Sequence, residues 1–526
     1  MSSTPSSLSR FTLLRLLTAL AAAALAISYC FNLYLAVYYS AFSMILFALG
    51  AATAIPAVRR GLATLRLPGA RALPGIVLIA SLLLANVLLV QADHAPATAR
   101  SNTAYVGATI ITGHKNAPAI ENGVVLVDTQ GRITASGPRA EIAIPADFDT
   151  VDLSGKFLMP GLINAHDHLM MFGDRDPHEP ADFSNYAVET PEGVGEWIIR
   201  TYPLKRLIKA MMEDNARKAL AGGVTTIREL ATVESLDVDL RKDIENGKRI
   251  GPRILAAGTP LCITGGHGYQ LGRIINGPID AREAVREAIA RGVDVIKITS
   301  TGGVADSRRI GEAGELQMTP EEIRAITDEA HRRNILVTAH AESSAGVLEA
   351  LRAGVDNIEH GASLSPEAIA LFLDNPLSLR GYSTLHPTLS VLAGGVAHSD
   401  EADISERLHV INTNAEIVHK ELISGFQNAL DNGVHIGVGT DSGVISHDSV
   451  WMEMDLFIKH GGISNELAIH MGTLGTAQSI GIQDITGSIE PGKAADFLIV
   501  SEDPREDIAA LASPAMVVAR GFRYPR

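Results

Sequence analysis

The stretch LMPGLINAHDHLMMFGD, residues 158–174, decides how the rest of this chain is interpreted. It places His166 and His168 two positions apart, shortly after Pro160-Gly161 and an apolar Leu-Ile pair. Side chains at positions i and i+2 of a β-strand point to the same side. Two imidazoles at the end of a strand therefore make half of a metal site. Two polar residues at the start of a loop would explain this stretch equally well. The choice between a metal site and an ordinary loop therefore depends on the rest of the chain.

The composition limits the class of protein. A chain of 526 residues is too long for one ordinary core, so we expect two or more domains. The formal net charge is −15, although residues 1–100 contain seven arginines, no lysine and a single acidic residue, Asp93. The rest of the chain is acidic, which argues against nucleic acid as a partner, because proteins bind nucleic acid through a basic surface. The two cysteines, Cys30 and Cys262, form neither a disulfide framework nor a cysteine-type zinc site.

The N-terminal region predicts a membrane anchor over residues 1–98. No charged residue lies between Leu16 and Val58, a run of 43 residues. One helix needs only about 20 apolar residues to cross a bilayer, so this run favours two helices. A second apolar run, Leu73 to Gln91, is long enough for one more crossing. The expected membrane helices lie near residues 16–32, 33–58 and 73–91.

The charges between these runs predict the orientation of the anchor. The stretch RRGLATLRLPGAR, residues 59–71, is the most basic loop of the region, and the positive-inside rule places it in the cytoplasm. Three crossings then leave residue 92 onward outside, as a multi-pass cell-membrane protein with an extracytoplasmic (periplasmic) catalytic domain. A signal peptide cleaved near residues 24–26 would leave the same outward face. Buried core helices of a soluble domain are the remaining alternative, and residues 94–103 resemble a polar linker.

The rest of the chain predicts an α/β architecture in three segments. Strand-and-turn texture over 104–160 and again over 486–526 suggests a small β-sandwich built from both ends. Between them, residues 161–485 alternate short apolar strands with helices, and eight such pairs argue for a (β/α)₈ TIM barrel. The expected strands are 161–166, 223–230, 253–258, 293–300, 335–341, 355–361, 382–388 and 434–442. The expected helices include 203–223, 280–292, 319–334, 343–354, 365–375 and 404–432.

Six metal-type or ionisable residues fall at the ends of these expected strands. A barrel builds its active site at the C-terminal ends of its strands. A buried lysine or aspartate there is costly unless it is neutral, paired or modified. Each residue alone has an ordinary explanation, as a core histidine, an ion-pair partner or a helix N-cap. Six such residues at strand ends on the same face of the barrel argue for an active site. They are His166 and His168 on strand 1, Lys297 on strand 4, His340 on strand 5, His360 on strand 6 and Asp441 on strand 8.

The order His-x-His, Lys, His, His, Asp resembles the metal-dependent amidohydrolase superfamily. The resemblance covers roughly residues 104–520 and includes the motifs PGLINAHDH, GVTTIREL, TGGHG, VIKITSTGG, TAHAES, ALRAGVDNIEHG, GVGTDSG and GSIEPGKAADFLIV. Within it, the chain is similar to the branch of prolidase-like dipeptidases, Xaa-Lys/Arg carboxypeptidases and ochratoxin-type amidases. The three-pass anchor is not part of that pattern.

The resemblance implies two divalent metal ions, usually zinc. One ion would take His166, His168 and Asp441, and the other would take His340 and His360. Lys297, carboxylated by CO₂, would bridge the two as a carbamate. A water held between the ions would lose a proton and become the nucleophile. Asp441 would accept that proton and deliver it to the departing amine.

The residues expected to contact substrate come from one loop and from the end of one strand. His267 and Tyr269, in TGGHGYQ (264–270), follow strand 3 and are predicted to fold over the pocket, although a Gly-rich turn facing solvent explains the same letters. Arg228, at the end of strand 2, is predicted to hold a carboxylate, with a structural pairing to Glu229 or Asp306 as its alternative. Glu342 stands where relatives often have Tyr or His, a departure that puts an oxyanion donor there in doubt.

These observations predict a membrane-tethered hydrolase of peptide-like C–N bonds. The expected substrates are small molecules, namely dipeptides or N-acyl amino acids, with a free carboxylate on the leaving group. Cyclic amides, lactones or other esters are the alternative for the same site, and an inactive membrane interaction module is a third. The lipid bilayer is the other expected partner, nucleic acid is not, and the sequence leaves homo-oligomerisation open.

Overall fold

The computed structural model describes residues 100–184, 202–397 and 404–525, which lie within one compact unit, Ala95–Arg526. The membrane anchor predicted over residues 1–98 lies outside these described residues. Among the helices of the described ranges, none is both long and apolar enough to cross a membrane.

The barrel is built from two parallel sheets that backbone hydrogen bonds join on both sides. On one side, Ala165 N–H donates to Val438 O at 2.9 Å, and on the other, Asp294 N–H donates to Ala256 O at 2.7 Å. The carboxyl ends of the strands therefore meet at one mouth, where side chains from distant sequence positions converge. The first sheet has the order β6-β7-β8: β6 (Leu162–Asp167), β7 (Val224–Glu229) and β8 (Arg253–Ala256). The second has the order β10-β9-β11-β12-β13-β14-β15: β9 (Leu261–Ile263), β10 (Arg273–Ile275), β11 (Val295–Thr299), β12 (Leu336–Ala341), β13 (Asn357–His360), β14 (Thr384–His386) and β15 (His435–Ile436).

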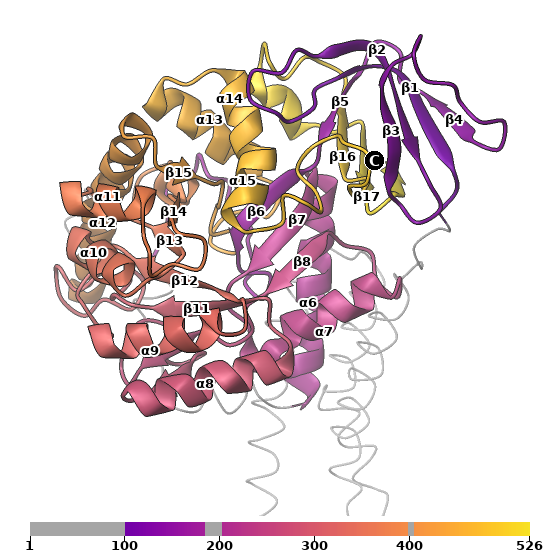
Figure 1. Ribbon diagram of the computed structural model, residues 1–526. Helices are drawn as coiled ribbons and strands as arrows, with labels where there is room; N and C mark the ends of the chain where they lie inside the picture. Colours follow the sequence, from indigo (N-terminus) through magenta and orange to yellow (C-terminus); the bar gives the residue numbers. More distant parts are fainter. Residues whose placement is uncertain (1–99, 185–201, 398–403, 526) are drawn as a thin grey trace, which may run out of the picture. The chain divides into compact units, whose positions relative to one another are not determined.

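Helices lie on the outside of these strands (Figure 1). Their starts follow ordinary capping chemistry: in α9, Thr319 and Glu322 form a reciprocal capping box, and Ser343, Ser365 and Ser405 cap α10, α11 and α12. The helices are α6 (Tyr202–Ala221), α7 (Leu236–Glu245), α8 (Pro278–Arg291), α9 (Pro320–His331), α10 (Ser344–Arg352), α11 (Pro366–Leu373), α12 (Glu406–Asp431), α13 (Val450–Gly461), α14 (Asn465–His470) and α15 (Thr476–Ser479). Shorter turns of helix are η1 (Val233–Ser235), η2 (Leu389–Leu392), η3 (Met471–Gly475) and η4 (Ile508–Ala512).

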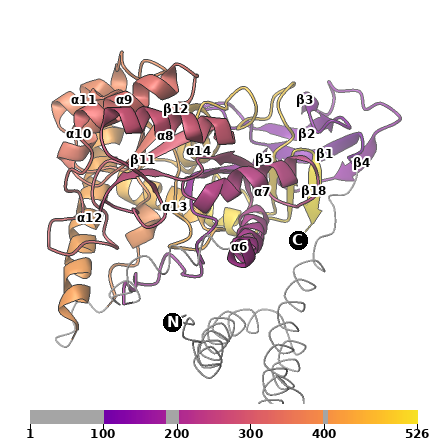
Figure 2. The same ribbon diagram turned by 90° about the horizontal axis from the view of Figure 1, so that it is seen from below.

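A third, mostly antiparallel sheet combines both ends of the described chain. Strand β5 is its centre, because it runs parallel to β1 and antiparallel to β16. Both views place β1–β4 on the opposite side of this unit from α10–α12 (Figures 1 and 2). The strands are β1 (Thr103–Ile110), β2 (Ile120–Val127), β3 (Ile133–Pro138), β4 (Asp149–Asp152), β5 (Phe157–Pro160), β16 (Phe497–Val500), β17 (Met516–Ala519) and β18 (Phe522–Pro525).

The expected α/β class is confirmed. Each of the eight strands expected between residues 161 and 442 coincides with one of β6, β7, β8 and β11–β15, and the six expected helices coincide with α6 and α8–α12. The sequence analysis did not anticipate β9 and β10, a short parallel pair beside β11, because each strand has only three residues. This pair carries the turn that contains His267.

Candidate metal centre

His166, His168 and Asp441 converge at the barrel mouth. The Nε2 atoms of the two histidines are 3.2 Å apart, and the Oδ1 atom of Asp441 lies 3.3 Å from the first and 2.9 Å from the second. His166 comes from β6, whereas Asp441 follows β15 at the far end of the sequence. Gly439 permits this approach, because a Cβ atom there would lie 2.9 Å from Cβ of His166.

The contacts of this first group turn its ligand atoms toward one another. Nδ1 of His166 lies 2.8 Å from Oε2 of Glu359, and Nε2 on the other side of the ring faces His168 and Asp441. Burial, assisted by Lys297, lowers the pKa of His166 to about 4. Burial alone would raise the pKa of Asp441, but the neighbouring His166 and His168 outweigh it and hold that pKa well below its usual range. An imidazole lone pair beside a carboxylate at about 3 Å fits a bound cation.

A second group lies on the neighbouring strands. His340, Glu342 and His360 each offer a ligand atom, and these atoms lie within 4.8 Å of one another. Nδ1 of His360 is 2.9 Å from the Thr388 hydroxyl, which fixes the orientation of the ring. Burial holds the pKa values of His340 and His360 well below the usual range, so both rings are neutral and suited to metal binding. The two groups adjoin, since the ring centroids of His166 and His360 are 5.0 Å apart.

Two of these residues have a strained backbone. His360 has a φ of 68° and Asp441 a φ of 54°, both in the left-handed region that residues other than glycine seldom adopt. Such positions cost about 1–3 kcal/mol each and gather at functional sites. Each of the two candidate ligand groups therefore contains one residue with a strained backbone.

Lys297 lies on β11 among these groups, with a side chain that is only 5% exposed. Burial lowers its pKa to about 8, against the opposing influence of Glu359 and Asp441. Its charge also lowers the pKa values of His166 and His340, one from each group. A lysine that is partly neutral near physiological pH is a nucleophilic amine, which is the form that reacts with CO₂.

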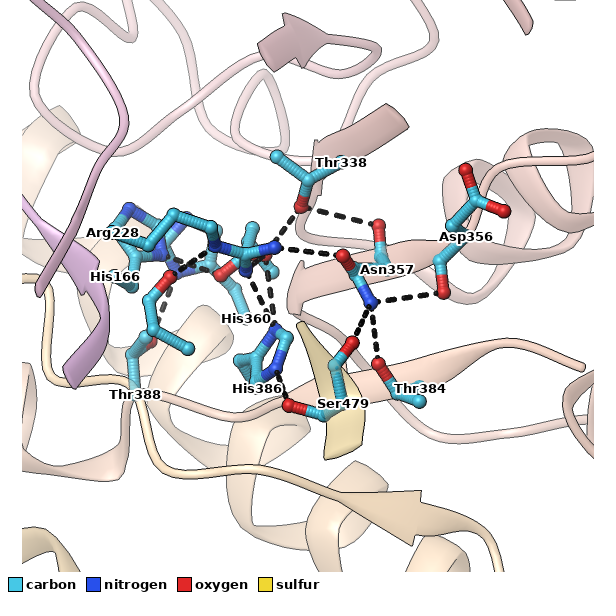
Figure 3. Close-up of polar contacts among 12 residues, drawn as sticks. His166, Arg228, Thr338, Asp356, Asn357, His360, Thr384, His386, Thr388 and Ser479 are labelled. Atoms are coloured by element: carbon cyan, nitrogen blue, oxygen red, sulfur yellow. Dashed lines mark hydrogen bonds and ion pairs between the residues drawn. The ribbon is translucent and has the colours of Figure 1, made fainter. Parts of the chain in front are cut away.

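Arg228 is a structural residue, which corrects its expected role in binding a substrate carboxylate. It is 1% exposed, and its Nε and Nη1 donate to Ala165 O and Asn357 Oδ1 at 2.7 Å each. Its Nη2 pairs with Oε1 of Glu359 at 2.5 Å, in place of the Glu229 or Asp306 pairing considered from the sequence. Each nitrogen of the guanidinium thus has a partner in a buried network, which Figure 3 shows beside His166 and His360.

The same network joins the strands under the site. Glu359 accepts from Arg228, from the Thr338 hydroxyl and from His386, whose Nδ1 is 3.1 Å from Oε1. Nε2 of His386 lies 2.9 Å from the Ser479 hydroxyl (Figure 3). The other oxygen of Glu359 lies 2.8 Å from Nδ1 of His166, so one carboxylate links the buried arginine to a candidate metal ligand. The sequence analysis missed Glu359, although it directly precedes His360 in NIEHG.

The loop residues expected to contact substrate have different positions. The His267 ring stacks on His340 with centroids 4.3 Å apart, and its Nδ1 is 2.8 Å from Asp306 Oδ1. Gly303 makes room for this ring, because a Cβ atom there would lie 2.5 Å from it. Tyr269 lines a small pocket together with His267, and it also lines a cavity of about 680 Å³ with residues of α7 and α8. The substrate contacts of both residues stay predictions.

The barrel, the histidine groups and the buried lysine define a metal-type hydrolase site, and comparisons with known proteins agree. The model of the amidohydrolase family matches residues 157–522, and the chain belongs to this family. Ochratoxinase from Aspergillus niger is 28% identical over 386 residues, covering 68% of this chain and 73% of the relative. The crystal structure of a candidate prolidase from Bifidobacterium longum has 38% identity and a TM-score of 0.68, covering 82% of this chain and 96% of that one. A Xaa-Pro dipeptidase with methionine bound in its active site has 28% identity and a TM-score of 0.67, covering 81% and 100%.

These findings confirm the enzyme class expected from the sequence. The protein is an amidohydrolase-family hydrolase that acts on carbon–nitrogen bonds.

Proposed function

We propose that the protein is a binuclear metal-dependent hydrolase of dipeptides or N-acyl amino acids. The observation that carries the proposal is the pair of adjoining ligand groups at one barrel mouth, with Lys297 close to both. His166, His168 and Asp441 would hold one divalent ion, His340 and His360 the other, and a carbamate on Lys297 would bridge them. Zinc suits this set of imidazole and carboxylate ligands. The similarity to a Xaa-Pro dipeptidase and to ochratoxinase supports peptide-like substrates.

The chain's own residues supply the remaining chemistry. When bound, the ions supply Lewis acidity and lower the pKa of water. The Asp441 carboxylate, held ionised by its histidine neighbours, takes up a proton from the attacking water and returns it to the departing amine. His267 is held by Asp306 and stacks on His340. Burial alone would lower the pKa of His267, but Asp306 outweighs it and raises that pKa. The protonated ring orients the substrate by donating from Nε2.

A substrate screen tests this function. The full-length protein, loaded with zinc, is assayed against dipeptides, N-acyl amino acids, cyclic amides and lactones, with His168→Asn as the inactive control. We expect turnover of the first two classes and a loss of at least about a hundredfold in the variant, because metal catalysis contributes several kcal/mol at about 1.4 kcal/mol per tenfold. Turnover confined to cyclic amides or lactones would replace the proposed substrate class, and activity unaffected by His168→Asn would contradict the metal mechanism.

We also propose that the enzyme is tethered to the cell membrane with its catalytic unit on the extracytoplasmic side. The uncharged runs 16–58 and 73–91, with the basic stretch 59–71 between them, support this topology. An alkaline phosphatase fused after residue 100 should be active in cells, whereas a green fluorescent protein at the same place, exported unfolded, should be dark. Replacing the four arginines of 59–71 by glutamine should weaken this orientation. The opposite reporter pattern in the unmodified protein would place the enzyme in the cytoplasm.

A further inference from the structure

Glu342 places a buried carboxylate beside His340 and His360, and one oxygen of this carboxylate accepts no hydrogen bond from the described part of the chain. It directly follows the end of β12, two residues after His340, and its backbone N–H donates to the Thr301 hydroxyl at 3.1 Å. Its side chain is only 9% exposed. Among the residues that the structure describes, its Oε2 atom has no hydrogen-bond partner.

The neighbouring histidine does not satisfy this oxygen. Nε2 of His340 lies 3.2 Å from Gly302 O but 3.8 Å from Oε2 of Glu342, beyond hydrogen-bonding distance. A buried carboxylate oxygen without a hydrogen-bond partner is costly, and a cation bound beside it would remove that cost. The cation must be held between Glu342 and the groups around it.

The geometry favours a metal ion as that cation. The Glu342 carboxylate, His340 and His360 present ligand atoms within 4.8 Å of one another, and this is the His₂-carboxylate set that zinc commonly takes. We propose that Glu342 is a third protein ligand of the ion held by His340 and His360. The proposal rests on the metal centre of the proposed function and goes beyond it: the second ion is retained even when Lys297 carries no carbamate.

The test measures metal binding rather than turnover. Full-length protein and its Glu342→Gln variant are stripped and titrated with Zn²⁺ by calorimetry, and the bound metal is counted by elemental analysis. Glu349→Gln, on the following helix α10, is the matched control for loss of one carboxylate. We expect the wild type and the control to bind two ions, and Glu342→Gln to bind the weaker of them at least about tenfold less tightly, as is usual for groups that support a metal site.

A second pair of variants separates Glu342 from the carbamate. Lys297→Ala should still bind two ions, whereas Lys297→Ala/Glu342→Gln should bind one. Elemental analysis of both zinc-loaded variants counts the bound ions, while circular dichroism shows that both are folded.

The outcomes are distinct. If Glu342→Gln binds both ions as the wild type does but raises KM for substrates that carry an ammonium group, Glu342 binds substrate and the assignment is overturned. Unchanged metal binding with unchanged KM overturns it as well. If the wild type itself binds fewer than two ions at saturation, the binuclear centre fails, and the proposed function falls together with this inference.

Discussion

Lys297→Ala should reduce turnover by at least about a hundredfold while leaving the fold intact. The carbamate proposed on this lysine would place one oxygen on each ion, and its loss removes a bridge from a centre that contributes several kcal/mol to catalysis. The buried Lys297 amine acts electrostatically on His166 and His340, and Asp441 acts on it, so its deletion leaves space near these residues. Short carboxylates such as acetate or propionate should enter it and restore part of the activity.

The measurement combines kinetics with a direct view of the modification. Protein exposed to ¹³C-bicarbonate should show a carbamate carbon resonance that is absent in Lys297→Ala. Lys459→Ala is the matched control, because this lysine is exposed and pairs with Asp455 on the surface of α13. Full activity in protein that lacks the carbamate resonance would rule out the bridging role, and a variant that no carboxylate rescues would argue against a simple loss of the bridge.

Periodicity explains why the sequence predicted the strands of the barrel and the residues at their ends. Buried parallel strands are short apolar runs, and residues at the C-terminal end of such a run lie at the carboxyl edge of the sheet. His166, His340 and Asp441 were placed at that edge because each lies at the end of an expected strand. The strand order then places residues up to 275 positions apart, such as His166 and Asp441, within 3.3 Å.

The same reasoning failed for Arg228, because the direction of a side chain within a barrel depends on residues far away in the sequence. Arg228 lies on β7 and points to Asn357 and Glu359 on β13, which the sequence does not mark as its neighbours. Glu342 is the reverse case. Its departure from the pattern of relatives was visible in the sequence, but its unpartnered oxygen was not.

Arg228→Met should be the most destabilising single substitution beneath the site. Removing one partner of a buried ion pair typically costs about 3–5 kcal/mol, because the other charge is left without compensation. Here the remaining charge is Glu359, which is 0% exposed and whose pKa Arg228 helps to hold well below the usual range against burial. Glu359→Gln should also loosen His166, and the double variant should be less destabilised than the sum of the two, since it leaves no unpaired charge.

Urea unfolding followed by circular dichroism, with KM measured in parallel, checks this expectation. Arg352→Met is the matched control, because Arg352 forms a two-pronged pair with Glu367 at 2.7 Å while both side chains are about half exposed. Exposed pairs contribute about 0–1 kcal/mol, so the free energy of unfolding should fall by several times more in Arg228→Met than in the control. Equal losses in the two variants would show that the buried network adds little to stability. If Arg228→Met left the free energy of unfolding unchanged but raised KM, Arg228 would be a substrate-binding residue. A guanidinium that holds the strands together cannot be removed without weakening the fold.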